Sequence, residues 1–194
     1  DVDVENKRVL DAGASTGGFT DCALQNGAAE VVAVDVGRGQ LHQRLATDPR
    51  VASHERTNVR HLRAGDLGAP FDAVIADLSF ISLGTVAEAL VSLAAPGADL
   101  VWLVKPQFEA ARAEVSRGSG VITDPQVWRS VLADVGATIA GHGATIMEVM
   151  ASPLRGADGN VEFLLHARAP GGATGPTVPL DQLIDQAMGE VEAG

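Results

Sequence analysis

The chain alternates short apolar runs with helix-capable segments, and this alternation limits the fold more than any other feature of the sequence. Apolar runs of strand length recur at Arg8–Ala12, Glu30–Asp35, Phe71–Asp77, Asp99–Lys105, Thr145–Ala151 and Val161–Ala167. The helix-capable segments between them are Phe19–Asn26, Gln40–Ala46, Gly84–Ala94 and Pro125–Ala140. Such alternation indicates an α/β fold in which helices cover both faces of a mostly parallel sheet.

The last two apolar runs depart from this alternation. They are joined by SPLRGADGN, in which Asp158-Gly159 suits a turn, so we predict a terminal antiparallel pair. Residues 1–169 are expected to form one domain, since this length suits a single α/β core. Residues 170–194 read as a flexible linker, Pro170–Pro179, followed by a helix whose apolar residues dock on the body.

Composition excludes several classes of protein. No apolar run approaches the roughly 20 residues of a membrane span, and the first ten residues are too charged for a secretory signal. A single cysteine excludes an internal disulfide framework, and the five histidines show no metal-ligand spacing, so we expect a cytoplasmic protein without a metal site. A net charge of −11 argues against a nucleic-acid binder acting alone, because phosphate contacts dominate such affinity.

The stretch DAGASTGGFTD, Asp11–Asp21, admits three interpretations. It contains the G-x-S-x-G of a hydrolase elbow, but Ser15 follows the first strand, where no upstream strand can supply an oxyanion hole. As a dinucleotide fingerprint it has Ser15 where the second glycine should admit a pyrophosphate. S-adenosylmethionine (SAM) has no phosphate, and Gly13, Gly17 and Gly18 permit close backbone approach to it. The pattern therefore favours SAM, with a nicotinamide-dependent oxidoreductase as the alternative.

The next apolar run supports a nucleoside ligand. EVVAVDVG places Asp35 about 20 residues beyond the glycine turn, where an acid can accept both ribose hydroxyls. Ligands of open α/β sheets bind at the carboxyl ends of strands, and Gly13–Phe19, Asp35 and Asp77 all fall at such ends.

Three charged residues, Asp77, Lys105 and Glu162, stand at the ends of three different apolar runs. The lysine is notable because the fourteen basic residues comprise twelve arginines and only two lysines. Flanking carboxylates hold a lysine in its charged form, so Lys105 suits electrostatic stabilisation of a developing alkoxide better than proton abstraction. We expect the three residues to meet beside a methyl donor. Phe80 and Phe108 are candidates to stack an exposed base, although core packing is the simpler role for each.

An ordered set of motifs resembles the TlyA (hemolysin A-like) family of FtsJ-type rRNA ribose 2′-O-methyltransferases. These motifs are DAGASTGGFTD, AVDVGRGQL, DPRV followed by ERTNVR, ADLSFISL, LVKPQFE and SPLRGADGNVEFLLH. The resemblance implies a class I SAM-dependent methyltransferase fold with a seven-stranded sheet, SAM as cofactor and ribosomal RNA or a ribosomal subunit as partner. It also implies that Asp77, Lys105 and Glu162 are catalytic. The cofactor-binding residues are then Gly13, Ala14, Ser15, Gly17, Gly18, Phe19, Asp35, Val36, Asn58 and Asp77.

Two parts of the family pattern are missing from the sequence. The family's first catalytic lysine precedes the first strand, and Lys7 cannot replace it, since five strand residues put it roughly 16 Å from the carboxyl end. The family's S4-like RNA-binding domain has no counterpart. We therefore expect a methyltransferase core that binds SAM but has little activity alone. A cytolysin, suggested by the family's other name, is the second alternative, although no strongly basic amphipathic helix supports it.

Overall fold

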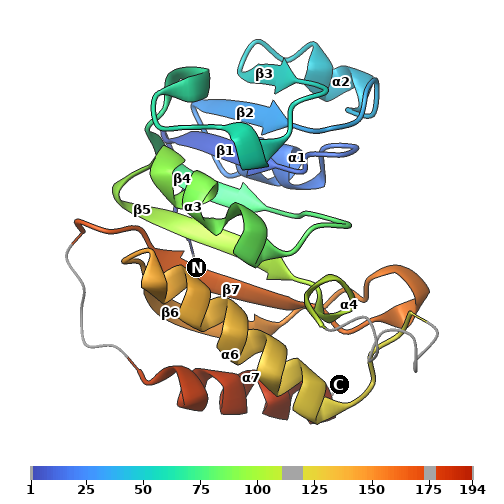
Figure 1. Ribbon diagram of the computed structural model, residues 1–194. Helices are drawn as coiled ribbons and strands as arrows, with labels where there is room; N and C mark the ends of the chain where they lie inside the picture. Colours follow the sequence, from blue (N-terminus) through green and yellow to red (C-terminus); the bar gives the residue numbers. More distant parts are fainter. Residues whose placement is uncertain (1, 111–119, 173–177, 194) are drawn as a thin grey trace.

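Seven strands of the described residues form one sheet (Figure 1). The computed structural model describes residues 2–110, 120–172 and 178–193. The strands are β1 (Arg8–Ala12), β2 (Glu30–Val34), β3 (Val51–His54), β4 (Phe71–Ala76), β5 (Ala94–Val104), β6 (Thr145–Ala151) and β7 (Phe163–Arg168). Their order across the sheet is β3-β2-β1-β4-β5-β7-β6.

The last strand in sequence is the antiparallel one, as predicted. β1 to β5 pair in parallel, whereas β7 is inserted between β5 and β6 and is antiparallel to both. This direction has a consequence for function, because β7 begins at the edge where the parallel strands end. A residue just before β7 therefore lies at the same edge as a residue just after β5.

Helices pack on both faces of the sheet, as predicted. They are α1 (Gly18–Gln25), α2 (Gln43–Ala46), α3 (Leu83–Leu93), α4 (Pro106–Glu109), α6 (Pro125–Gly141) and α7 (Leu180–Ala193), with the 3-10 turns η1 (Val59–His61), η2 (Asp66–Gly68) and η3 (Ala157–Gly159). Apolar residues of α1 pack on one face with Val9 and Val31. Those of α3 and α6 pack on the other face with Leu10 and Trp102 in the larger core. In Figure 1, α3 and α6 cross in front of the sheet.

The predicted C-terminal helix docks on the body as expected. Its apolar residues Leu183, Ile184, Ala187 and Met188 are buried in the larger core, and α7 packs on both β6 and α6. The two helices approach closely at Gly136, where a Cβ atom would lie 2.7 Å from the Leu180 side chain. Residues 173–177 of the predicted linker lie outside the described residues.

Two strands differ from the sequence prediction. The edge strand β3 was not among the predicted runs, because its four residues VASH are only half-buried or exposed and carry no apolar pattern. β5 begins at Ala94, directly after α3, although Pro96-Gly97 predicts a loop there. The breaker residues still act, since the register with β4 shifts from Phe71↔Ala94 to Ala73↔Asp99 across them.

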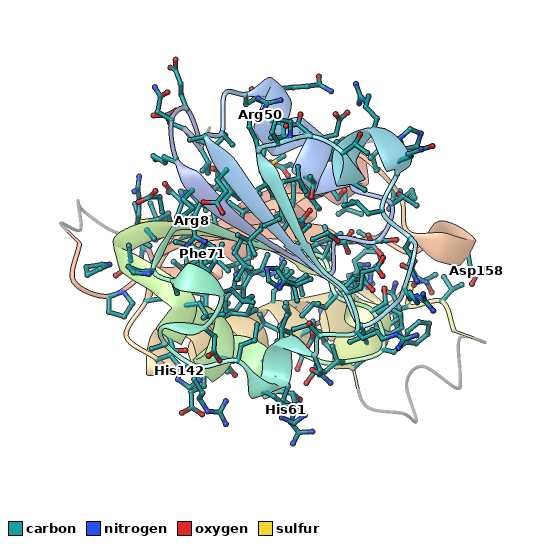
Figure 2. All side chains as sticks on the ribbon, turned by 90° about the horizontal axis from the view of Figure 1, so that it is seen from above. Arg8, Arg50, His61, Phe71, His142 and Asp158 are labelled. Atoms are coloured by element: carbon teal, nitrogen blue, oxygen red, sulfur yellow. The ribbon has the colours of Figure 1, made fainter. Side chains whose placement is uncertain are left out.

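The amino ends of the strands carry a dense set of ion pairs. Arg8 lies over the Phe71 ring, 4.4 Å from its centroid, and its Nε donates to Glu30 at 2.6 Å. Figure 2 places Arg8 and Phe71 at the end of the sheet away from Asp158. Within β5, buried Asp99 lies 2.8 Å from His166 Nε2, 3.2 Å from Arg168 Nε and 3.6 Å from Lys7 Nζ.

Candidate active site

The glycine turn after β1 is held against the end of β4. Gly13 has a φ of 86°, and a Cβ atom at this position would lie 2.2 Å from the Asp77 carbonyl oxygen. The amides of Gly13 and Ala14 both donate to the Val34 carbonyl, at 2.8 and 3.1 Å. Only glycine fits this contact, since a side chain meets backbone there and the φ is positive. The turn predicted from sequence and the Asp77 backbone are thus in direct contact at the edge of the sheet.

Buried Asp11 anchors the helix that follows this turn. Its Oδ2 accepts a 2.6 Å hydrogen bond from the Thr20 hydroxyl, which joins β1 to the first turn of α1. Burial raises the Asp11 pKa to about 6, and the neighbouring Asp77 and Asp35 charges add to the increase, while the Thr20 hydrogen bonds lower it. Sequence analysis did not single out Asp11, although it opens the DAGASTGG motif. Its contacts indicate a structural role beneath the turn.

Asp35 bridges the glycine turn and the end of β2. Its Oδ2 accepts from the Ser15 amide at 2.8 Å, and its Oδ1 accepts from the Gly37 amide at 2.6 Å. Each carboxylate oxygen has a second lone pair, so the side chain can still accept two hydroxyl groups. Next to it, Val36 leaves 68% of its surface exposed, which is unusual for a large apolar residue and suits the flat face of a ligand.

A cavity of about 480 Å³ lies at this edge of the sheet, within the usual range of small-molecule sites. Its lining includes six of the predicted cofactor-binding residues: Gly13, Ser15, Asp35, Val36, Asn58 and Asp77. Asn58 caps η1 through its Oδ1, which accepts from the Arg60 amide at 3.0 Å, and this leaves its side-chain NH₂ available. Phe80, predicted from sequence as a stacking residue, also lines the cavity. The remaining lining residues were not predicted: Val34, Gln40, Thr57, Val59, Leu78, Ser79 and Ile81.

Four predicted cofactor residues do not line this cavity. Ala14 is buried under the turn. Gly17 caps α1 with a φ of 101°, and a Cβ there would collide with Leu41 and Leu45, so its glycine serves packing. Gly18 starts α1. The Phe19 side chain packs with the α1-side core, so any contact of Phe19 with a ligand in the cavity comes from its backbone.

Lys105 and Asp77 come together as predicted. Lys105 Nζ lies 2.5 Å from Asp77 Oδ1 and donates to the Ser79 hydroxyl at 3.2 Å. The lysine side chain is only 12% exposed, whereas that of Asp77 is 32% exposed. Asp77 belongs to the cavity wall, so the ion pair joins the cavity to the open surface beside it.

Glu162 lies just before β7 and completes the charged group. Its Oε1 accepts a 3.2 Å hydrogen bond from Gln107 Nε2, and the residue is buried. Burial raises the pKa of Glu162, the Asp77 charge adds to this, and the positive charge of Lys105 and the Gln107 hydrogen bond lower it. A Cβ at Gly156 would lie 2.1 Å from Glu162 Oε1, so the SPLRGADGN loop fits closely around the carboxylate.

The two candidate stacking residues lie together at the edge of the cavity. Phe80 is 91% exposed, with a φ of 66° that phenylalanine rarely adopts. Its ring centroid lies 5.1 Å from that of Phe108. Phe80 is therefore not a core residue, which corrects the simpler expectation for it. Two arginines, Arg112 and Arg117, are candidates from the sequence to contact phosphates, but both lie outside the described residues.

Comparison with known proteins agrees with this geometry. Residues 1–169 match the model of the FtsJ-like methyltransferases. The chain belongs to the FtsJ-like methyltransferase family. Within this family it is 54% identical, over 166 residues, to the 16S/23S rRNA (cytidine-2′-O)-methyltransferase TlyA of Mycobacterium tuberculosis. That match covers 85% of this chain and 61% of the relative, so the chain spans less than two thirds of the relative's length.

Solved structures show the same fold. A structure from Streptococcus thermophilus that carries a hemolysin name has a TM-score of 0.89 and 37% identity, and the match covers 99% of this chain and 70% of that one. The N-methyltransferase NodS of Bradyrhizobium japonicum has a TM-score of 0.59 at 20% identity, covering 84% and 85% of the two chains. This FtsJ-like methyltransferase is thus a TlyA-type member with the class I SAM-dependent fold, as the sequence motifs predicted.

The described part of the chain lacks two features, a membrane-spanning helix and a cluster of metal ligands. None of its helices combines the length and apolar character that crossing a membrane requires. The same residues contain no group of three or more histidine, cysteine or acidic side chains arranged to hold a metal ion.

Proposed function

We propose that this FtsJ-like methyltransferase transfers a methyl group from SAM to a ribose 2′-hydroxyl of ribosomal RNA. The observation that carries the proposal is the position of Asp77. Its backbone supports the glycine turn at Gly13, its side chain lines the cavity, and its carboxylate pairs with Lys105. A donor cavity and an acceptor site therefore share one residue. The name of the Mycobacterium tuberculosis relative, 16S/23S rRNA (cytidine-2′-O)-methyltransferase, supplies the substrate class.

The residues of the cavity fit SAM. When bound, SAM supplies an electrophilic methyl group on a sulfonium, and its adenosine and amino-acid parts need separate contacts. Asp35 offers acceptors for the two ribose hydroxyls, and the exposed Val36 offers an apolar surface for adenine. Asp77 offers a carboxylate near the ligand's ammonium, and the glycine turn leaves room for the backbone to approach. No feature of this wall requires a phosphate, which favours SAM over a nicotinamide dinucleotide.

Lys105 is the residue assigned to the acceptor hydroxyl. A sugar hydroxyl becomes a good nucleophile only as it loses its proton, and negative charge then develops on its oxygen. The Lys105 ammonium can stabilise that charge, and Asp77 and Ser79 fix the ammonium in position. Because the lysine side chain is largely buried, it has little freedom to swing away, and positioning of this kind contributes much of the rate.

Glu162 is assigned a supporting role in handling the proton. Burial raises the pKa of Glu162, which favours acceptance by this carboxylate of a proton released beside Lys105. The direct contact from Gln107 keeps this carboxylate oriented. Exposed Phe80, with Phe108 beside it, is assigned to stacking the target RNA base once that base is unpaired from the RNA helix.

The test begins with cofactor affinity. Calorimetric titration of SAM into the wild-type chain and into Asp35→Ala should give measurable binding that weakens at least tenfold in the variant, since two hydroxyl acceptors are lost. Asp181→Ala, which removes an exposed acid on α7, is the matched control and should bind like wild type. Equal binding by Asp35→Ala, or no binding by the wild type, would contradict the cavity assignment.

Methyl transfer is measured separately. Ribosomal subunits and SAM with a labelled methyl group are incubated with the chain, and the label is mapped to a 2′-O-methylated cytidine. Because the chain spans 61% of its curated relative, transfer is compared with that of a version extended to the relative's full length. Transfer to protein or to a base nitrogen would overturn the ribose assignment. Leakage of dye from liposomes treated with the chain would favour the cytolysin alternative instead.

A further inference from the structure

The short helix α4 and the residue before it contact three different segments of the chain through alternate residues. Lys105, just before it, pairs with Asp77 after β4. Gln107 donates to Glu162 before β7. Glu109, at its end, accepts a 2.7 Å hydrogen bond from the Leu83 amide at the start of α3. Figure 1 shows α4 just beyond the end of β5, between the loops that these contacts join.

The Glu109 contact is unusual because α3 already has a residue suited to cap it. Ser82 is at the N-cap position, where serine commonly accepts a hydrogen bond from the helix amides. Here its side chain makes no cap bond, and its hydroxyl pairs with the Thr85 hydroxyl at 2.8 Å. The first amide of α3 is satisfied instead by a residue 26 positions away. A local cap would stabilise α3 alone, whereas this cap also ties α3 to α4.

The tied segments are those that carry the reacting groups. Residues 77–82 connect β4 to α3 and include Asp77, Ser79 and Phe80. Lys105 directly precedes α4. The segment 77–83 and the segment 105–109 are therefore joined at two points. One is the ion pair between Asp77 and Lys105, and the other is the hydrogen bond between the Leu83 amide and Glu109.

We propose that Glu109 is a positioning residue for methyl transfer: its bond to the Leu83 amide holds the Lys105 segment against the Asp77 segment. This inference rests on the proposed function for its effect on rate, but the tie itself can be observed without any substrate. Glu109 touches neither the cavity nor the reacting groups, so it acts only through the two segments.

The buried environment of Glu109 disfavours its ionised form, so the carboxylate reduces the stability of the fold when it is charged. Burial raises its pKa to about 7, and only the Leu83 hydrogen bond opposes the increase. Exposed Asp134 on α6 lines the same small pocket as Glu109, with Val131, Val135 and Thr138, and the described residues that line it include no basic side chain. Because the folded pKa lies above the ordinary value of 4.5, the ionised form lowers stability as pH rises from about 4.5 through 7.

The test compares two replacements that differ in one property. Glu109→Gln removes the charge but keeps an oxygen that accepts from the Leu83 amide, whereas Glu109→Leu keeps a similar volume and removes the acceptor. Glu88→Leu, at an exposed position on α3, is the matched control. We expect hydrogen exchange of residues 79–86 and 105–110 to rise at least fivefold in Glu109→Leu and less than twofold in the other two proteins.

Rates then separate positioning from binding. Glu109→Leu should lower kcat for rRNA methylation about tenfold, with the Kd for SAM and the Tm close to those of wild type, and Glu109→Gln should retain most of the rate. Unchanged exchange in Glu109→Leu would overturn the proposal, as would a rate loss of the same size in Glu109→Gln. If wild type transfers no methyl group, the proposed function fails, and the exchange experiment still decides whether Glu109 ties the two segments.

Discussion

Two ion clusters of opposite composition lie at opposite edges of the sheet. At the edge where the parallel strands β1 and β4 begin, one buried carboxylate, Asp99 within β5, is surrounded by the basic groups of Lys7, His166 and Arg168. Just beyond the end of β5, one ammonium, Lys105, pairs with Asp77 and interacts electrostatically with Glu162. Both clusters join sequence-distant strands, and both look conspicuous as collections of charged residues.

The two clusters differ in whether the central charged group lies beside a cavity that can hold a ligand. Asp99 is 2% exposed in its side chain, and the surrounding basic groups satisfy it. Burial alone would raise the Asp99 pKa, but the His166 hydrogen bond and the charges of Arg168, His166 and Lys7 hold it below its usual value. Lys105 lies instead beside a cavity with an exposed aromatic residue at its edge. A cluster of charge therefore indicates a site only where a cavity accompanies it.

The largest expected effect distinguishes the two lysines. Lys105→Met should lower methyl transfer at least about 100-fold, because the charge opposite the developing alkoxide is lost. The Kd for SAM should change by less than about threefold, since the lysine does not line the cavity. Lys7→Met removes the lysine of the Asp99 cluster and should leave the rate within about twofold. Equal rate losses in the two variants would remove the distinction between the clusters.

The next effect concerns Asp11 and the pH dependence of stability. Because the folded pKa is raised to about 6, the native state binds a proton more tightly than the unfolded state, so stability falls as pH rises from about 4 through 6. Asp11→Asn keeps an acceptor for Thr20 and cannot ionise, so it should be more stable than wild type by up to about 3 kcal/mol at pH 8. The two unfolding free energies should converge near pH 4, as denaturant titrations can measure.

A smaller effect is expected in the Asp99 cluster. Asp99→Ala leaves the surrounding basic groups without their carboxylate and should cost about 2 kcal/mol of unfolding free energy at pH 7, with the Kd for SAM unchanged. Since the Asp99 pKa is lowered, its contribution is present at neutral pH and is lost as pH falls below about 3.8. The stability difference between variant and wild type should shrink accordingly. A weaker Kd for SAM would show that this cluster also serves the cavity.

Sequence predicted the fold where local and global signals agreed. The bounds of β1 and β6 match the apolar runs Arg8–Ala12 and Thr145–Ala151, because these strands are bounded by turn residues. β3 was missed because an edge strand with one side in solvent needs no apolar pattern. The register shift between β4 and β5 could not be predicted, since Pro96-Gly97 indicates a loop unless the pairing with β4 is known.

The site shows the same division. The Asp77–Lys105 pair could be predicted because both residues follow parallel strands that are neighbours in the sheet. The bond from Leu83 to Glu109 could not, since nothing in PQFE indicates which helix it caps. Phe80 was underrated for a related reason: an aromatic residue in an apolar motif reads as core, and only its surroundings reveal a 91% exposed ring.

The contact between Gly13 and the Asp77 carbonyl also bears on redesign of this enzyme class. Donor preference and acceptor preference are usually pictured as two modules that can be exchanged independently. Here Gly13 and the Asp77 carbonyl are in contact with no space for even a methyl group, and both residues line the cavity. A side chain added at Gly13 must therefore displace Asp77, so engineering of new alkyl donors should begin at other lining residues such as Gln40 and Thr57.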